Sequence, residues 1–243
     1  MIYLTGDTHG SIDIQKIFDF ADRMDYEGKE LSKDDYLIVL GDFGLIWHDK
    51  MQCPLKFRQE EYLLDLLDEL PFTTLFIDGN HENHVRLNSY PVSFWKGGKV
   101  SFIRKSVIHL KRGQIFDLDG KKFFTTGGAT SIDKAFRHRG ISYWEEENIS
   151  AEDLDEAFAN LAKVSNSVDY VLTHAAPVDF ARELVEKQYF KYGADINEMH
   201  LRDIQSAIRF TKWYCGHYHL DYENGKCKCL YNEIVALDEN GET

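Results

Sequence analysis

The sequence has little of the material that marks disulfide-stapled or membrane-spanning proteins. Its 243 residues include only four cysteines and four prolines, and the cysteines follow no regular spacing. They therefore do not describe a disulfide framework, and we expect free thiols. The sequence contains no apolar run of the ~18 residues that a membrane helix needs, and it does not open with a basic, apolar leader. We therefore predict a cytoplasmic protein with no membrane partner.

The sequence also has fewer basic than acidic side chains. The chain has 28 Lys and Arg residues against 41 Asp and Glu residues, which gives a formal net charge of −13. Non-specific binding to duplex DNA depends on basic side chains that neutralise phosphates, so no such binding is expected. The charge does not exclude a small or single-stranded nucleotide held at a metal centre.

Two of the cysteines stand close together, as Cys227-Lys228-Cys229. This spacing could supply half of a structural zinc site, but no second cysteine pair completes it. Alternation within a strand near the C-terminus places both thiols on one face of that strand. We favour the strand.

The residues that are abundant suit a buried core, since 43% are apolar and 14% are aromatic. We predict one domain over residues 1–243. The N-terminal third alternates strand-like with helix-like periods, which is typical of parallel strands joined by helices. The strands expected there are 1–5, 36–40 and 73–77, and the helices are 11–24 and 55–70.

From Gly97 onward the apolar runs become shorter. Arg112-Gly113 and Asp119-Gly120 are interpreted as turns of antiparallel hairpins, so a second sheet is expected to begin here. The strands expected in this part are 99–103, 107–110, 114–118 and 121–126. Beyond them we expect helices at 150–162, 177–187 and 198–208, strands at 170–173 and 211–215, and a closing hairpin of 226–231 with 233–237.

Five apolar runs end in a side chain that can bind a metal. In the clearest, a strand-length run from Tyr36 ends in Gly41 and Asp42. In open α/β sheets, ligands bind in the crevice outside the carboxyl ends of the strands, so Asp42 is well placed for chemistry. Together with Asp42, the ends of the five runs supply Asp7, His9, Asn80, His174, His217 and His219.

This set contains imidazoles, carboxylates and an amide, but no thiolate. Such donors suit manganese, iron or zinc better than calcium or a structural zinc. Two divalent ions need about this many ligands, and an aspartate shared between them would leave a water that both cations acidify. We predict two divalent metal ions, with manganese favoured and iron, zinc or nickel as alternatives.

The motifs follow one another in a fixed order: Gly6-Asp7-Thr8-His9, Gly41-Asp42, Gly79-Asn80-His81-Glu82, Thr173-His174 and Gly216-His217-Tyr218-His219. In residue type, order and spacing they resemble the motif set of the calcineurin-like metallophosphoesterases. The resemblance spans almost the whole chain. It implies an α/β fold of the αββα sandwich type, in which two mixed β-sheets are flanked by helices.

The resemblance also implies how the ligands are shared. Asp42 would bridge two metals, with Asp7, His9 and His219 completing one ligand set and Asn80, His174 and His217 the other. The implied reaction is hydrolysis of a phosphoester by in-line attack of a metal-bridging hydroxide. Asn80 would orient the phosphate, and His81 would stabilise charge or protonate the leaving oxygen. The catalytic residues predicted in this way are Asp42, Asn80 and His81, and the last two also bind the substrate.

One departure from the family bears on the substrate. The protein Ser/Thr phosphatase branch has an aspartate three residues after its bridging aspartate and then an arginine, whereas this chain has Leu45 and Ile46. The missing aspartate would have oriented His81, and the missing arginine would have gripped a phosphomonoester. We therefore favour a phosphodiester or nucleotide substrate, with a phosphoprotein or phosphomonoester as the alternative.

A function of a different class is a non-catalytic metal-binding scaffold on the same fold. A scaffold does not need every ligand together with His81, and this sequence retains them all. We therefore favour an enzyme. The sequence defines no oligomeric state.

The segment from Gly127 to Trp144 has no clear period and is too long for a simple connection, which favours a functional loop. In relatives of this type, the corresponding loop borders the active cleft. Its bases Lys134, Arg137 and Arg139 are opposed within the loop only by Asp133. We predict that Arg137 and Arg139 bind the substrate, with Arg137 first because its planar fork can hold a phosphate through two bonds. In the alternative, these bases pair with Glu145, Glu146 and Glu147 and pin the loop.

Two further features have alternative interpretations. Glu82 follows His81 directly and is interpreted as an acid at the start of a helix near Asn83. Trp47 and the Tyr143-Trp144 pair could stack on a nucleobase, or they could be buried or rim aromatics.

Overall fold

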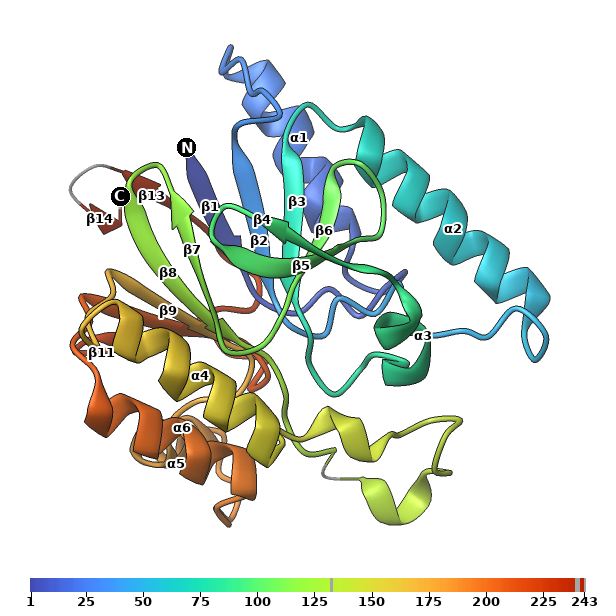
Figure 1. Cartoon of the computed structure of the whole chain (residues 1–243). Coiled ribbons are helices and arrows are strands. Elements are labelled where there is room, and N and C mark those ends of the chain that lie inside the picture. The colour runs from blue at the N-terminus through green and yellow to red at the C-terminus, as the bar shows by residue number, and fades with distance from the viewer. Residues whose placement is uncertain (132, 239–240, 243) are drawn as a thin grey trace.

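Two β-sheets lie face to face in the computed structural model, with helices on both outer faces (Figure 1). The structure describes residues 1–131, 133–238 and 241–242. The αββα sandwich implied by the resemblance is thereby confirmed.

The first sheet has the strand order β14-β13-β1-β2-β3-β6-β5-β4. β1, β2, β3 and β6 run parallel to one another. Helices α1 (Gln15–Tyr26) and α2 (Pro54–Glu69) pack against its outer face. The strands of this sheet are β1 (Ile2–Thr5), β2 (Tyr36–Leu40), β3 (Thr73–Ile77), β4 (Val92–Trp95), β5 (Gly98–Phe102), β6 (Val107–Leu110), β13 (Ile234–Asp238) and β14 (Gly241–Glu242).

The second sheet has the order β11-β12-β10-β9-β8-β7. Helices α4 (Ala151–Lys163), α5 (Val178–Lys187) and α6 (Ile196–Ala207) lie on its outer face (Figure 1). A short helix, α3 (His84–Ser89), follows β3. The strands of the second sheet are β7 (Gln114–Leu118), β8 (Lys121–Thr126), β9 (Tyr170–Thr173), β10 (Lys212–Cys215), β11 (Tyr222–Asn224) and β12 (Cys227–Cys229).

The inner strands are buried on both faces, which is why they are continuous apolar runs in the sequence. Ile38 and Leu75 point between the sheets and pack in the same cluster as Phe116 of the opposite sheet. Leu37 and Phe76 point the other way, toward α1 and α2. Because both faces are covered by apolar side chains, polar groups of these strands are available to a ligand chiefly at the strand ends.

Two predictions about topology are wrong. β5 and β6 extend the first sheet, since β6 pairs with β3, so the second sheet begins only at β7. Arg112-Gly113 therefore connects the two sheets, whereas Asp119-Gly120 joins the β7–β8 hairpin as expected. The closing hairpin expected from 226–231 and 233–237 is also absent, because β12 pairs with β10 and β11 while β13 pairs with β1 and β14. A short apolar run does not specify which sheet edge it joins.

Other local predictions are confirmed. The helix expected at 150–162 is α4, which begins with a capping box in which Ser150 and Asp153 each accept a hydrogen bond from the other's backbone N–H. Cys227 and Cys229 lie in β12, as the strand interpretation requires, and both are buried free thiols. Within the described part of the chain, no helix has the length and apolar character to cross a bilayer.

Candidate active site

The predicted ligands converge because their strands are neighbours. β1, β2 and β3 lie side by side in one sheet, and β8, β9 and β10 lie side by side in the other. The loops after five of these strands bring potential ligand atoms to within 4.8 Å of one another in three overlapping groups. The groups are Asp7 with His9 and His219, His9 with Asp42 and His81, and Asp42 with His174 and His217.

Asp42 lies at the centre of these groups. Its Oδ2 lies 3.5 Å from Nε2 of His9, and its Oδ1 lies 3.2 Å from Nε2 of His174. Oδ1 also accepts a hydrogen bond of 2.7 Å from the backbone N–H of His81. The two oxygens of one buried carboxylate therefore face different sets of imidazoles.

Asp7 and Asn80 add further oxygens beside these imidazoles. Oδ1 of Asp7 accepts the backbone N–H of His217 at 3.0 Å. Its Oδ2 lies 3.1 Å from Nε2 of His219 but is buried without a hydrogen bond to any residue that the structure describes. Oδ1 of Asn80 lies 3.4 Å from Nε2 of His174. A buried carboxylate oxygen without a hydrogen bond, among imidazoles and an amide oxygen, fits a site for divalent cations.

The protonation of the imidazoles reflects the two carboxylates. Burial disfavours the charged form of His174, but Asp42 and Asp7 raise its pKa to about 10. His9 behaves in the same way, with burial outweighed by Asp42 and Asp7, and its pKa is raised to about 9. Burial and the neighbouring His174 lower the pKa of His217 to about 4. A metal binding at His9 and His174 would displace protons.

Contacts on the far side of the imidazoles orient them. Nδ1 of His174 donates to the backbone oxygen of Leu40 at 2.7 Å, which turns Nε2 toward Asp42. Nδ1 of His9 lies 3.0 Å from Oδ2 of Asp13. Partners of this kind fix the ring and its tautomer in metal sites.

The backbone of the site is strained at four residues. His9, Asp42, His217 and His219 have φ values of 44°, 47°, 69° and 51° in the left-handed region. Such conformations cost on the order of 1 kcal/mol or more each, and they are retained where the surrounding structure requires them. Gly79 is required for a related reason, because a Cβ there would lie 2.2 Å from Oδ1 of Asp42.

His81 lies beside the Asp42 and His9 side chains but has no aspartate to orient it. Leu45 and Ile46, which replace the residues of the phosphatase branch, are fully buried in the core. Instead, the ring of Trp47 lies nearly parallel to that of His81, with centroids 5.7 Å apart. Nη2 of Arg137 lies 3.3 Å from Nε2 of His81, and since a guanidinium only donates, Nε2 is the acceptor. Burial lowers the pKa of His81, and Arg137 adds to this effect.

Glu82 is not a helix-start acid, contrary to its interpretation from the sequence. It is fully buried and accepts hydrogen bonds from the backbone N–H groups of Gly44 at 3.2 Å and Gly79 at 2.6 Å. Burial and the neighbouring Asp42 raise its pKa to about 8. The helix cap is Asn83, which accepts from Arg86. Glu82 thus joins the loops after β2 and β3, and its position directly after His81 was the only signal in the sequence.

The loop that carries Asn80 and His81 is also held by Asp78, which directly follows β3. Asp78 accepts hydrogen bonds from Nε of Arg112 at 2.8 Å and lies 3.2 Å from Nε2 of His109. Arg112 also donates to the backbone oxygens of Asn148 and Glu146, at 2.7 Å and 2.9 Å. Although burial opposes ionisation, Arg112 holds the pKa of Asp78 well below its usual range. This buried arginine therefore links the loop after β3 to residues 146–148, which directly follow the 127–144 loop.

The structure places the two predicted substrate arginines differently. Arg137 reaches the site and contacts His81, whereas Arg139 is 67% exposed and pairs with Glu145 at 2.9 Å. Lys134 also pairs with an acid, because its Nζ lies 2.9 Å from Oε1 of Glu147. The pairing alternative therefore describes Lys134 and Arg139, but not the contact of Arg137 with His81.

Glu147, one of the acids considered as partners of the loop bases, is fully buried. Its carboxylate accepts hydrogen bonds from the backbone N–H and the hydroxyl of Ser131, at 3.1 Å and 2.9 Å. The Ser131 hydroxyl in turn accepts from Nδ2 of Asn80 at 3.4 Å. Trp144 is buried as well, with 3% of its surface exposed. These buried contacts anchor the loop beside the site.

The fold and this set of ligands define a class of metal-dependent hydrolase. The chain belongs to the calcineurin-like phosphoesterase family, whose sequence model matches residues 1–221. It is similar to lariat debranching enzyme A of Xenopus laevis, at 23% identity over 244 residues that cover 91% of this chain and 43% of the relative. It is also similar to the lariat debranching enzyme of Schizosaccharomyces pombe, at 22% identity over 237 residues that cover 85% of this chain and 50% of the relative. The chain thus spans half or less of the length of these relatives. Membership of the family confirms the prediction of a phosphoester hydrolase.

Proposed function

We propose that this chain is a dinuclear metal-dependent phosphodiesterase. The observation that supports this most strongly is the position of Asp42, whose two oxygens face His9 on one side and His174 on the other. Two divalent cations, when bound, would supply the Lewis acidity that activates water and offsets the charge of the phosphate. Manganese is the favoured ion, because the donors are nitrogen and oxygen without thiolate.

The ligands would divide around Asp42. Asp7, His9 and His219 would hold one ion, and Asn80, His174 and His217 the other. The Nδ2 group of Asn80 would donate to a phosphate oxygen. In the structure it donates instead to the hydroxyl of Ser131 at 3.4 Å. His81 would hold a proton for the leaving oxygen, and Arg137 would bind a phosphate oxygen beside it.

A diester or nucleotide is favoured over a phosphoprotein. Leu45 and Ile46 are buried and give the site neither an acid nor a cation, so the grip on a phosphomonoester is missing at that position. The names of the two relatives, which are lariat debranching enzymes, are consistent with this preference. The cytoplasmic location remains a prediction.

A panel of substrates tests the proposal. With added manganese, we expect bis(p-nitrophenyl) phosphate to be hydrolysed with a higher kcat/KM than p-nitrophenyl phosphate or a phosphoserine peptide. Faster hydrolysis of either monoester would favour the phosphatase alternative. Hydrolysis of none of them by metal-loaded protein would favour the scaffold.

Arg137→Ala is expected to reduce kcat/KM for a diester by about 1.5–3 kcal/mol, the scale of a charge-assisted hydrogen bond. The melting temperature should stay nearly unchanged, because a pair with Asp133, whose side chain is 49% exposed, contributes little to stability. Arg139→Ala is the matched control, since it removes the same charge from the same loop but should leave the kinetics unchanged. Normal kinetics in Arg137→Ala together with a lower melting temperature would assign Arg137 to loop structure.

A further inference from the structure

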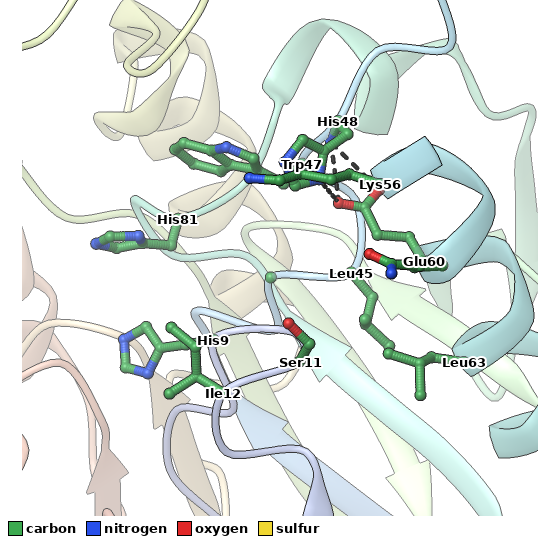
Figure 2. A pocket seen from close by; sticks show the side chains of 12 residues that line it. His9, Ser11, Ile12, Leu45, Trp47, His48, Lys56, Glu60, Leu63 and His81 are labelled. Carbon is green, nitrogen blue, oxygen red and sulfur yellow. Dashed lines mark hydrogen bonds and ion pairs between the residues drawn. The ribbon is translucent and has the colours of Figure 1, made fainter. Parts of the chain in front are cut away.

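A cleft of about 360 Å³ opens directly beside the metal-binding groups. It lies between the turn at Ser11 and Ile12, the segment from Gly44 to His48, and one face of α2. Figure 2 shows His9 and His81 along one side and Glu60 and Leu63, from α2, on the opposite side. Its volume lies in the range of pockets that bind small molecules. It therefore continues the site toward α2.

The walls of the cleft are largely apolar. Leu63 and Trp47 line the cleft. Ile12 stands at the mouth with 76% of its surface exposed, only three residues from His9. An exposed aliphatic side chain and a partly exposed indole beside a candidate phosphate site suit contact with a flat organic ring.

Lys56 is the cation of the cleft. It is exposed and forms no ion pair or side-chain hydrogen bond with any residue that the structure describes. In Figure 2 its side chain extends from α2 toward the side where Trp47 and His81 lie. The net charge of the protein is −13, yet this lysine at the cleft has no acidic partner among the described residues.

The acid in the cleft does not neutralise Lys56. Glu60 is buried, and its carboxylate is engaged by Arg86 and by both the backbone N–H and the ring of His48. The charge of Glu60 is thus offset by Arg86 and by hydrogen bonds from His48. The positive charge of Lys56 remains available to an anion.

We propose that this cleft binds the organic half of the substrate and that Lys56 binds a second phosphate on that half. The substrate class is then a nucleotide phosphodiester that carries another phosphate on the same sugar, as each unit of an oligonucleotide does. The proposal rests on the proposed phosphodiesterase function. It follows from the continuity of the cleft with His9 and His81, its apolar walls and its one free cation among the described residues.

Two substrates that differ only in the second phosphate test this. They are thymidine 5′-(p-nitrophenyl phosphate) and its 3′-phosphorylated form. At low salt, the wild-type protein should hydrolyse the phosphorylated form with about tenfold higher kcat/KM, as expected for one charge-assisted contact. Lys56→Gln should bring the two values to within about twofold of each other, and Lys56→Arg should restore most of the difference. Lys50→Gln, which removes one exposed charge nearby, should preserve it.

Equal kcat/KM values for the two substrates in the wild type would overturn the proposal. An equal loss of preference in Lys50→Gln and Lys56→Gln would also overturn it, because the effect would then be one of net charge. Calorimetric binding of thymidine 3′,5′-bisphosphate, against thymidine 5′-monophosphate, tests the subsite without turnover. A protein that hydrolyses neither ester but binds the bisphosphate more tightly through Lys56 would contradict the phosphodiesterase function and support the subsite.

Discussion

Asp42→Asn is expected to abolish hydrolysis and to reduce bound metal more than the loss of any one histidine does. A neutral amide cannot bridge two cations or balance their charge, because one of its two donor oxygens is replaced by an NH₂ group. The substitution keeps the size of the side chain, and its remaining oxygen can still accept the backbone N–H of His81. Metal content and kcat of the variant, measured beside His9→Ala and His217→Ala, check this expectation.

The left-handed backbone of Asp42 supports this choice of variant, since asparagine adopts that conformation more readily than most residues. A folded Asp42→Asn protein is therefore expected, with a melting temperature close to that of the metal-free wild type. If the variant binds two equivalents of metal and retains more activity than the histidine variants, Asp42 is not the bridging ligand.

His81→Ala is expected to lose on the order of 10²–10⁴ in turnover while it retains nearly all of its metal, as for the loss of a positioned acid–base group. The test is needed because a ring nitrogen of His81 lies within 4.8 Å of potential ligand atoms of His9 and Asp42, so His81 could itself bind a metal. Single-turnover rates measured together with metal content separate the two roles. A variant that loses metal and activity together would make His81 a metal ligand.

His138→Ala is the matched control for this experiment. His138 is an exposed histidine of the 127–144 loop, and it is not part of the groups around Asp42. It should leave both turnover and metal content unchanged. The difference in turnover between His81→Ala and His138→Ala then reports what an imidazole does at position 81, and not the general effect of losing a histidine.

The convergence of the candidate ligands was predictable because each stands at the end of an apolar run. The inner strands are buried on both faces, so their boundaries are clear in the sequence, and parallel neighbours bring their ends together. The pairing of β5 and β6 could not be predicted in the same way. These strands are short and join β3, and local apolar character is the same whichever sheet a strand enters.

The supports of the site were less predictable than its ligands. Glu82 was interpreted as a helix-start acid and Glu147 as a possible partner of the loop bases. Both are fully buried and accept hydrogen bonds from backbone N–H groups. Arg112 stands before a glycine and was interpreted as part of a turn, but it links two loops of the site. The burial of these residues arises from packing between segments far apart in the chain, which no local pattern contains.

The most direct test of the dinuclear proposal is a metal titration of chelator-treated protein, assayed with an aryl phosphodiester. We expect the treated protein to be inactive and added manganese to restore activity to a plateau at two equivalents per chain. Hydrolysis by the treated protein at the untreated rate would contradict the account, and so would a plateau at one equivalent.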